Sequence, residues 1–342
     1  MKLGIVGLPG SGKATVFEAL TKNFAETGSK AENRIGTIQV PDDRVDRLSG
    51  LYNPRKTIYA RVEYFLPGTT EKSGAKGETG PWKNVRDCDA LIHCVRNFSG
   101  YGLEPASPAQ DFANLDQELV LADYMVVTKR FERLEMDGRR GKKPNPEEKA
   151  LLAECLQHLE NGRPLRHFPD LAAAPLLRGF AFLSAKPMLT LFNNEDEDDR
   201  LPETGMADKQ EGVVIRGKLE QELAQMTAEE AADFLAEFHI TATATDRVIK
   251  RSYEILGLIS FFTVGEDEVR AWTIQKETPA LDAADVIHSD IKQGFIRAEV
   301  LHYDDLMAAG SYAEARKNGD VRLEGKAYPV RDGDIINFRF NV

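Results

Sequence analysis

Several features that mark other classes of protein are scarce or absent in this chain. Only three of its 342 residues are cysteines, and Cys88, Cys94 and Cys155 do not have the spacing of metal ligands. No apolar run reaches the roughly 18 residues of a membrane span, and no signal peptide is recognisable. Few cysteines and no export signal fit a reducing compartment, so we expect a cytoplasmic protein without a membrane partner.

An excess of positive charge is also missing. The 44 lysines and arginines are outnumbered by 55 aspartates and glutamates, which gives a net charge of −11. Such a surface does not attract nucleic acid as a whole, so we expect no DNA partner, and any RNA contact must come from a local basic patch. The length allows two or three domains with ample core.

The chain opens with a glycine-rich phosphate-binding pattern in which one usual residue is replaced. The apolar run Leu3 to Val6 is followed by Gly7-x-x-x-x-Gly12-Lys13 and then by a helix-like segment. Backbone N–H groups of such a loop wrap a phosphate chain, and the lysine reaches the β- and γ-phosphates. The following Ser or Thr normally ligates Mg²⁺, but here that residue is Ala14.

This pattern predicts a nucleotide site, and a glycine-rich turn without a ligand is the alternative. The residues expected to hold the nucleotide are Gly7, Leu8, Pro9, Gly10, Ser11, Gly12, Lys13, Ala14 and Thr15.

The next hundred residues alternate between strand-like and polar segments. Residues 24–34 and Gly68–Pro81 are polar or glycine-rich and predict loops, and a short helix is expected to start in Pro41–Arg44 and to run through Leu51. The predicted strands are Thr37–Val40, Thr57–Phe65 and Ala90–Val95.

Residues 111–162 have helical periodicity. Apolar residues recur every three or four positions from Leu115 to Val126, and Met136–Lys143 interrupts the pattern. Asn145 is a plausible N-cap for a second helix that has Pro146 at its first position. We therefore expect a helical hairpin inserted into an α/β domain.

Four cations lie at the expected tip of this hairpin, and such a cluster can contact phosphate backbones of the ribosome or its RNA. A solvated charged turn is the plainer interpretation. The four residues are Arg139, Arg140, Lys142 and Lys143.

The second half predicts another buried strand, short strands and a small module. The strand Met188–Phe192 ends in a polar run, and ligands of open parallel sheets collect at such carboxyl ends. A strand Val213–Ile215 and a capping box at Thr227–Glu230, before a helix reaching Phe238, follow. From about Val269 the predicted strands are Ala271–Ile274, Phe295–Leu301, Lys326–Val330 and Ile335–Phe340.

The chain resembles the Obg-like ATPase (YchF) family of translational-GTPase relatives along its full length. The strings that carry this resemblance are Lys2–Pro9, Val40–Arg44, Cys88–Arg96, Glu118–Asp123, Lys186-Pro187, Tyr253–Ile259, Glu268–Ile274, Gly294–Val300 and Asp332–Val342.

The resemblance implies an α/β fold: a P-loop NTPase G domain with a mostly parallel sheet, a helical-hairpin insertion and a C-terminal β-grasp (TGS) domain. The corresponding boundaries are 1–110 with 172–265 for the G domain, 111–171 for the insertion and 266–342 for the TGS-like domain. The resemblance also implies a preference for adenine over guanine, and association with ribosomes or translation factors.

Departures from the family pattern concern the metal. Besides Ala14, an alignment on Lys76-Gly77-Glu78 puts Leu66 where the Asp of the family's Asp-x-x-Gly should stand, and Thr69 where its Gly should stand. Phosphoryl transfer in P-loop proteins depends on Mg²⁺ held by the loop hydroxyl and a strand-end Asp. We therefore predict weak or Mg²⁺-insensitive nucleotide binding with slow hydrolysis or none, and assign no catalytic residue and no metal ligand.

Three further residues are expected near the base. The family has Asn-Val-x-Glu where this chain has Asn193-Asn194-Glu195-Asp196. Asn193 can bond a purine N7, Asp196 can accept from guanine, and Gly217 lies where a third base-contacting loop is expected. The resemblance favours ATP, with GTP left open.

Two other functions stay open at this point. One is a nucleotide-independent scaffold, and the other is an active ATPase or GTPase that recruits Thr15 or Glu63 as substitute metal ligands. His93 is expected to be a core histidine and His288 to make a structural hydrogen bond, while Lys72 and Lys76 are expected to be solvated.

Overall fold

The computed structural model describes residues 1–24, 32–68, 82–100, 104–204, 212–237 and 243–341. It divides into two compact units, one formed by residues 1–37 and 63–248 and the other by 38–62 and 249–342. The predicted domain boundaries stay a prediction. The contact division differs from them in two segments, since residues 38–62 and 249–265 belong with the C-terminal half.

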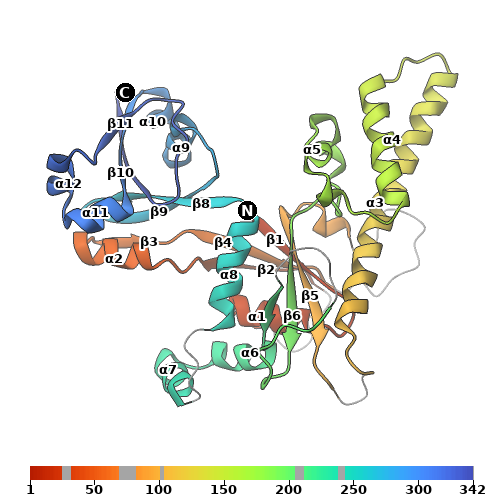
Figure 1. Ribbon diagram of the computed structural model, residues 1–342, viewed down its shortest axis with the longest axis horizontal. Helices are drawn as coiled ribbons and strands as arrows, with labels where there is room; N and C mark the ends of the chain where they lie inside the picture. The colour runs from red at the N-terminus through yellow and green to blue at the C-terminus, as the bar shows by residue number, and fades with distance from the viewer. Residues whose placement is uncertain (25–31, 69–81, 101–103, 205–211, 238–242, 342) are drawn as a thin grey trace. The chain divides into compact units, whose positions relative to one another are not determined.

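The first unit is built on a six-stranded sheet (Figure 1). Strand β1 is parallel to β4 and β5, β5 is parallel to β6, and β6 is parallel to β7. The near-continuous apolar runs of β1 and β5 suit strands that are covered on both faces. This confirms the predicted α/β class with a mostly parallel sheet. The order is β2 (Arg34–Gln39), β4 (Arg61–Leu66), β1 (Lys2–Val6), β5 (Ala90–Asn97), β6 (Met188–Asn194) and β7 (Val213–Ile215).

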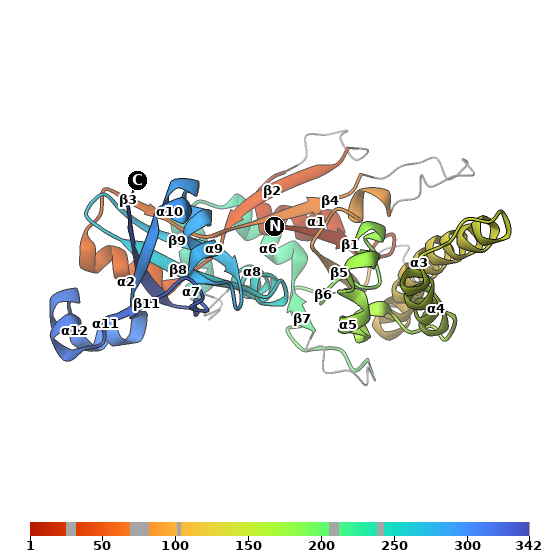
Figure 2. The same cartoon turned by 90° about the horizontal axis from the view of Figure 1, so that it is seen from above.

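The helical hairpin is confirmed as α3 (Pro108–Arg139) and α4 (Pro146–Glu160), which lie side by side in both views (Figures 1 and 2). Asn145 Oδ1 accepts hydrogen bonds from the backbone N–H groups of Glu147 at 2.9 Å and Glu148 at 3.4 Å, as its cap role predicts. The hairpin has its own apolar cluster, with Val127, Leu152 and Cys155 at its centre.

The remaining elements of the first unit connect the hairpin to the sheet or follow it. They are α1 (Lys13–Thr21), the short 3-10 helices Lys83–Val85, Leu165–His167 and Pro175–Phe180, α5 (Pro169–Ala172), α6 (Gly217–Gln225), α7 (Ala228–Glu237) and the first part of α8 (Ala244–Ile255), whose residues from 249 on belong to the second unit. Thr227 and Glu230 exchange the reciprocal hydrogen bonds of a capping box before α7, as predicted. Phe238, the predicted end of that helix, lies outside the described residues.

Within the described residues, no helix combines the length and the apolar character that crossing a bilayer requires.

The second unit has a mixed six-stranded sheet of its own. Its apolar core includes Phe261, Val300 and Ile336 of the sheet and Ala283 of α9. The strand order is β11 (Arg322–Glu324), β10 (Phe295–His302), β12 (Asp334–Phe340), β8 (Leu258–Val264), β9 (Glu268–Gln275) and β3 (Lys56–Ile58). Its helices are α2 (Asp43–Tyr52), α9 (Ala280–Ile287), α10 (Ser289–Gln293), α11 (Tyr303–Ala309) and α12 (Tyr312–Asn318).

Two predicted strands were wrong. The run Thr57–Phe65 is two strands, because β3 pairs with β9 of the second sheet while β4 pairs with β1 of the first. Lys326–Val330 forms no regular strand: Pro329 lacks an N–H donor and makes only an isolated bridge. Most of the loops expected at 24–34 and Gly68–Pro81, with Thr69, Lys72 and Lys76, lie outside the described residues.

Both singled-out histidines have structural roles. His93 is fully buried in β5 and stacks on Phe112 of α3 at 5.3 Å between ring centroids. Burial, with the charges of Arg166 and Lys13, lowers the pKa of His93 to about 3, so the ring is neutral. His288 Nδ1 accepts a hydrogen bond from the backbone N–H of Asp290 at 3.2 Å.

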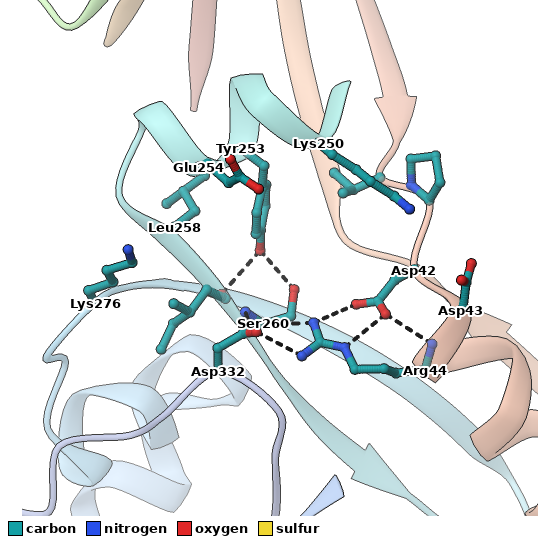
Figure 3. Close-up of a pocket in the computed structure, with 13 residues that line it drawn as sticks. Asp42, Asp43, Arg44, Lys250, Tyr253, Glu254, Leu258, Ser260, Lys276 and Asp332 are labelled. Carbon is teal, nitrogen blue, oxygen red and sulfur yellow. Dashed lines mark hydrogen bonds and ion pairs between the residues drawn. The ribbon is translucent and has the colours of Figure 1, made fainter. Parts of the chain in front are cut away.

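An arginine clamp holds the N-terminal segment of the second unit to its C-terminal strands (Figure 3). Arg44 donates two hydrogen bonds to the Asp42 carboxylate, at 2.9 and 2.8 Å, and one of 2.7 Å to Asp332. Asp332 also accepts the backbone N–H of Ser260 at 2.9 Å. Burial opposes the charge on Arg44, but these bonds raise its pKa, so the clamp stays ionised. The guanidinium lies 5.0 Å from the ring centroid of Phe262.

The substitution Arg44→Met should therefore lower the free energy of unfolding by about 1–2 kcal/mol, because it leaves the largely buried carboxylate of Asp42 and the exposed one of Asp332 without their shared cation. Denaturant unfolding followed by Trp272 fluorescence measures this. Arg55→Met is the control, since the Arg55–Asp267 pair is exposed on both sides and should contribute nothing measurable. Equal losses in both variants would contradict the clamp.

Candidate nucleotide-binding site

The predicted phosphate-binding loop lies between the end of β1 and the start of α1. Gly10 and Gly12 have φ values of 78° and 87°, a left-handed conformation that glycine adopts without strain. Gly12 is the N-cap of α1, and no side chain caps that helix end. The first-turn N–H groups of α1 are therefore available to an anion, which the helix dipole also favours.

Lys13 turns back onto this loop. Its ammonium donates to the carbonyl oxygens of Gly7 at 2.9 Å and Leu8 at 2.8 Å. Burial lowers the pKa of Lys13, which means that its charge is incompletely compensated by these carbonyls. A phosphate would supply the missing negative charge if Lys13 moved from the carbonyls to it.

Ser11 is the most enclosed residue of the loop. Its carbonyl oxygen accepts from the Cys94 thiol at 3.2 Å and from the Asn193 side chain at 3.1 Å. The Ser11 hydroxyl is buried and has no hydrogen-bond partner among the described residues. An orphaned buried hydroxyl is costly, and an oxygen of a bound phosphate would satisfy it. The loop therefore fits a phosphate chain.

Asn193 joins this loop to the third predicted segment. Its side chain is buried at the C-terminal end of strand β6. There Oδ1 accepts the Gly217 N–H at 3.0 Å, while Nδ2 donates to the Ser11 carbonyl. A Cβ at Gly12 would lie 2.2 Å from Nδ2, and one at Gly217 would lie 2.5 Å from Oδ1. Both glycines are therefore needed for the close approach of Asn193. The second Nδ2 proton remains for the predicted purine contact.

The neighbouring polar residues hold the loop after β6. Asp196 Oδ1 accepts the backbone N–H of Leu219 in α6 at 3.1 Å, which ties the loop to that helix. Asn194 donates to the carbonyls of Asp198 at 3.1 Å and Arg200 at 2.8 Å. Asn194 is thus a structural residue in the place where GTPases have a base-packing lysine. Sequence reasoning missed its role, as it missed that of Cys94.

The structure thus brings together the loop Gly7–Gly12, Asn193, Asp196 and Gly217, all at the carboxyl ends of the parallel strands. Ala14 and Thr15 lie in the first turn of α1, where Ala14 is exposed.

The residues for Mg²⁺ do not fit. Leu66 is buried at the end of β4, so the strand end that normally offers an aspartate is apolar. Glu63 pairs with Lys2 in the sheet. Because Lys2 stands five residues before Gly7 along β1, Glu63 lies about 16 Å from the loop in the strand direction. The open alternative that Glu63 is a substitute metal ligand is therefore wrong, and Thr15 is the remaining candidate.

Comparisons with known proteins show the family of the chain. The "Ribosome-binding ATPase YchF" of Bacillus subtilis (strain 168) is 38% identical over 99% of this chain and 99% of its own length. The protein of the same name from Escherichia coli O157:H7 is 35% identical over 100% of this chain and 99% of its own length. The chain belongs to the YchF family.

Two further comparisons concern parts and fold of this YchF-family chain. The family model "YchF-GTPase_C: Protein of unknown function (DUF933)" matches residues 258–341. The structure titled "Structure of the Schizosaccharomyces pombe YchF GTPase" superposes with a TM-score of 0.83 at 28% identity, covering 99% of this chain and 97% of that one. A GTP-binding protein from Pyrococcus horikoshii OT3 shares the fold, with a TM-score of 0.58 at 19% identity over 100% of both chains.

The basic tip of the YchF-family hairpin is exposed. Arg139 is the last residue of α3, and Arg140, Lys142 and Lys143 follow it in the turn. Lys142 is paired with Asp137 at 2.9 Å in an exposed contact that a stronger anion could replace.

The bridge through Asn193 gives a direct test of the site. Asn193→Asp keeps the acceptor for Gly217 but places a carboxylate oxygen against the Ser11 carbonyl, so the loop loses a donor and gains a repulsion. We expect the free energy of unfolding to fall by about 1–3 kcal/mol, and nucleotide affinity to fall with it. Denaturant titration and calorimetry measure these. The control is Asn194→Asp, which should destabilise the chain with a smaller loss of affinity, and an unchanged affinity in Asn193→Asp would contradict the bridge.

Proposed function

We propose that this chain binds a purine nucleotide at its P-loop, with ATP preferred over GTP, and hydrolyses it slowly or not at all. We also propose that it associates with the ribosome in the cytoplasm. The observation that carries the nucleotide proposal is the Asn193 bridge, because it holds the phosphate loop and the base-contacting segment in one arrangement. The names of its relatives, "Ribosome-binding ATPase" and "YchF GTPase", support the same function.

The proposal of slow hydrolysis rests on the residues at the two positions that hold Mg²⁺ in P-loop enzymes. Ala14 and Leu66 replace two groups that hold Mg²⁺ against the β- and γ-phosphates in P-loop enzymes. Lys13, the loop N–H groups and the Ser11 hydroxyl can still bind phosphate oxygens without the metal. Binding that survives the loss of Mg²⁺, with little turnover, is the expected consequence.

In this proposal each domain of the chain has its own role. Residues 1–110 and 172–265 form the G domain, 111–171 the hairpin that contacts the ribosome or its RNA, and 266–342 a TGS-like β-grasp domain. The chain as a whole is acidic, so the tip of the hairpin is the best candidate for a phosphate-backbone contact.

A nucleotide-independent scaffold is the second candidate. The contacts of the Lys13 ammonium with the carbonyls of Gly7 and Leu8 favour it, because they give the ammonium hydrogen-bond acceptors without a ligand.

Calorimetry with ATP, GTP and their diphosphates, in Mg²⁺ and in EDTA, separates these candidates. We expect binding that changes little with Mg²⁺ and that Lys13→Ala weakens at least about tenfold, because a charge-assisted contact to phosphate is lost. Lys149→Ala, on the hairpin, is the control and should bind normally. No binding of any nucleotide would support the scaffold, and rapid phosphate release that disappears in Lys13→Ala would overturn slow hydrolysis.

The ribosome contact is tested by co-sedimentation at several salt concentrations. The double variant Arg139→Ala/Arg140→Ala should bind ribosomes more weakly, with a salt dependence reduced by about two charges. The matched control is Arg133→Ala/Lys149→Ala, which removes two cations from the same hairpin away from its tip. Equal effects in both variants would exclude a specific role for the tip.

A further inference from the structure

An aromatic cavity of about 640 Å³ lies within the second unit, away from its arginine clamp. Its walls come from the end of β8, from β9 and β12, and from helices α2, α9, α10 and α12. Helices α2 and α12 lie at the same end of this unit in both views (Figures 1 and 2). The aromatic residues that line it are Tyr52, Trp272, Tyr312, Phe338 and Phe340. A volume of several hundred cubic ångströms with mostly apolar walls is typical of a small-ligand site.

One wall of this aromatic cavity is fixed in place. The Trp272 indole donates to Thr263 Oγ1 at 2.9 Å and stacks on Phe261, with 6.4 Å between ring centroids. The Arg270 guanidinium lies 3.8 Å from the centroid of the indole ring. This contact shows that the Trp272 indole accepts a planar cation on its ring, although Arg270 itself is not among the residues that line the cavity.

Two tyrosine hydroxyls belong to a mostly apolar lining, whose other polar residues are Thr263, Glu268 and Asn337. The hydroxyls of Tyr52 and Tyr312 are buried and make no geometrically sound hydrogen bond among the described residues, and the Glu299 carboxylate lies near the hydroxyl of Tyr312. Burial raises the pKa of both tyrosines, so both hydroxyls are neutral and can each accept and donate. A ligand with several N–H groups would satisfy them.

The charge of the lining residues favours a ligand of positive charge. Among the described residues that line the aromatic cavity, Glu268 alone is charged. Its closest ion pair is with Arg270 at 3.8 Å, which is beyond hydrogen-bonding distance, so the carboxylate can still accept. A nucleotide or another phosphate would meet a negative charge with no cation in the lining to offset it.

We propose that the aromatic cavity binds a planar guanidinium or amidinium cation on an apolar stem, the chemistry of an arginine side chain presented by a basic protein. Aromatic walls stack on the flat cation, and the two tyrosine hydroxyls and Glu268 accept its N–H groups. The acidic charge of the whole chain also favours a basic partner. This site is independent of nucleotide binding at the P-loop.

Three compounds of one shape test the charge preference in the full chain. Benzamidine, benzamide and benzoate carry a positive, a neutral and a negative group on the same ring. Quenching of Trp272 fluorescence in a Trp82→Phe background measures binding. We expect benzamidine to bind at least about tenfold more tightly than benzamide, because a charged hydrogen bond is added, and benzoate to bind most weakly. Benzoate binding as tightly as benzamidine, or no binding of any of the three, would overturn the proposal.

Substitutions locate the ligand within the aromatic cavity. Glu268→Gln should remove the advantage of benzamidine over benzamide, whereas Glu266→Gln, outside the lining, should keep it. Tyr52→Phe and Tyr312→Phe should weaken both compounds, since each removes one hydroxyl without changing the ring. Thermal unfolding confirms that each variant is folded, and an unchanged preference in folded Glu268→Gln would refute the assigned carboxylate.

Discussion

The candidate nucleotide site depends on one buried amide. The Asn193 side chain donates to the Ser11 carbonyl of the phosphate loop and accepts from the Gly217 N–H at the start of α6. Three chain segments that are far apart in sequence are positioned by these two hydrogen bonds. The amide fits only because both of its neighbours lack a Cβ, so the glycines at 12 and 217 are a steric condition of the site as much as a conformational one.

The proposed function requires that a phosphate loop be kept while the groups that hold Mg²⁺ in P-loop enzymes are replaced. The backbone N–H groups of the loop and the helix end do not depend on side-chain identity, so they survive substitutions around them. The metal position depends on particular hydroxyl and carboxyl groups, and the chain has Ala14 and Leu66 there. Without these groups the site has less positive charge to neutralise the phosphate oxygens during phosphoryl transfer. The backbone N–H groups that bind the phosphates are kept.

Local patterns in the sequence predicted local structure well. The phosphate loop, the Asn145 cap, the Thr227 capping box and the helical pair each depend on residues within a few positions of one another. The errors concern pairing over long distances. The alternation of Thr57–Phe65 gave no sign that its two halves join different sheets, and the sequence around Lys326 gave no sign that Pro329 meets Pro279.

The same limit applied to the sites. The type of residue at 193 suggested a contact with the base, but its bridging role needed the positions of two distant loops. The aromatic cavity and the Arg44 clamp each combine residues from around position 50 with residues beyond 260. No spacing rule links such segments, because their proximity is set by the packing of the finished unit.

Strand β3 decides what can count as an independent piece of this chain. It contributes only Lys56–Ile58, yet it forms the edge of the C-terminal sheet and covers β9. A fragment starting at Leu258, where the family match begins, would expose the β9 edge to pairing with other molecules and would also lack Arg44. If this C-terminal region were recombined with another protein during evolution, another strand would have to replace β3 at the edge of the sheet. The C-terminal region is therefore expected to be inherited together with the N-terminal segment that contains β3.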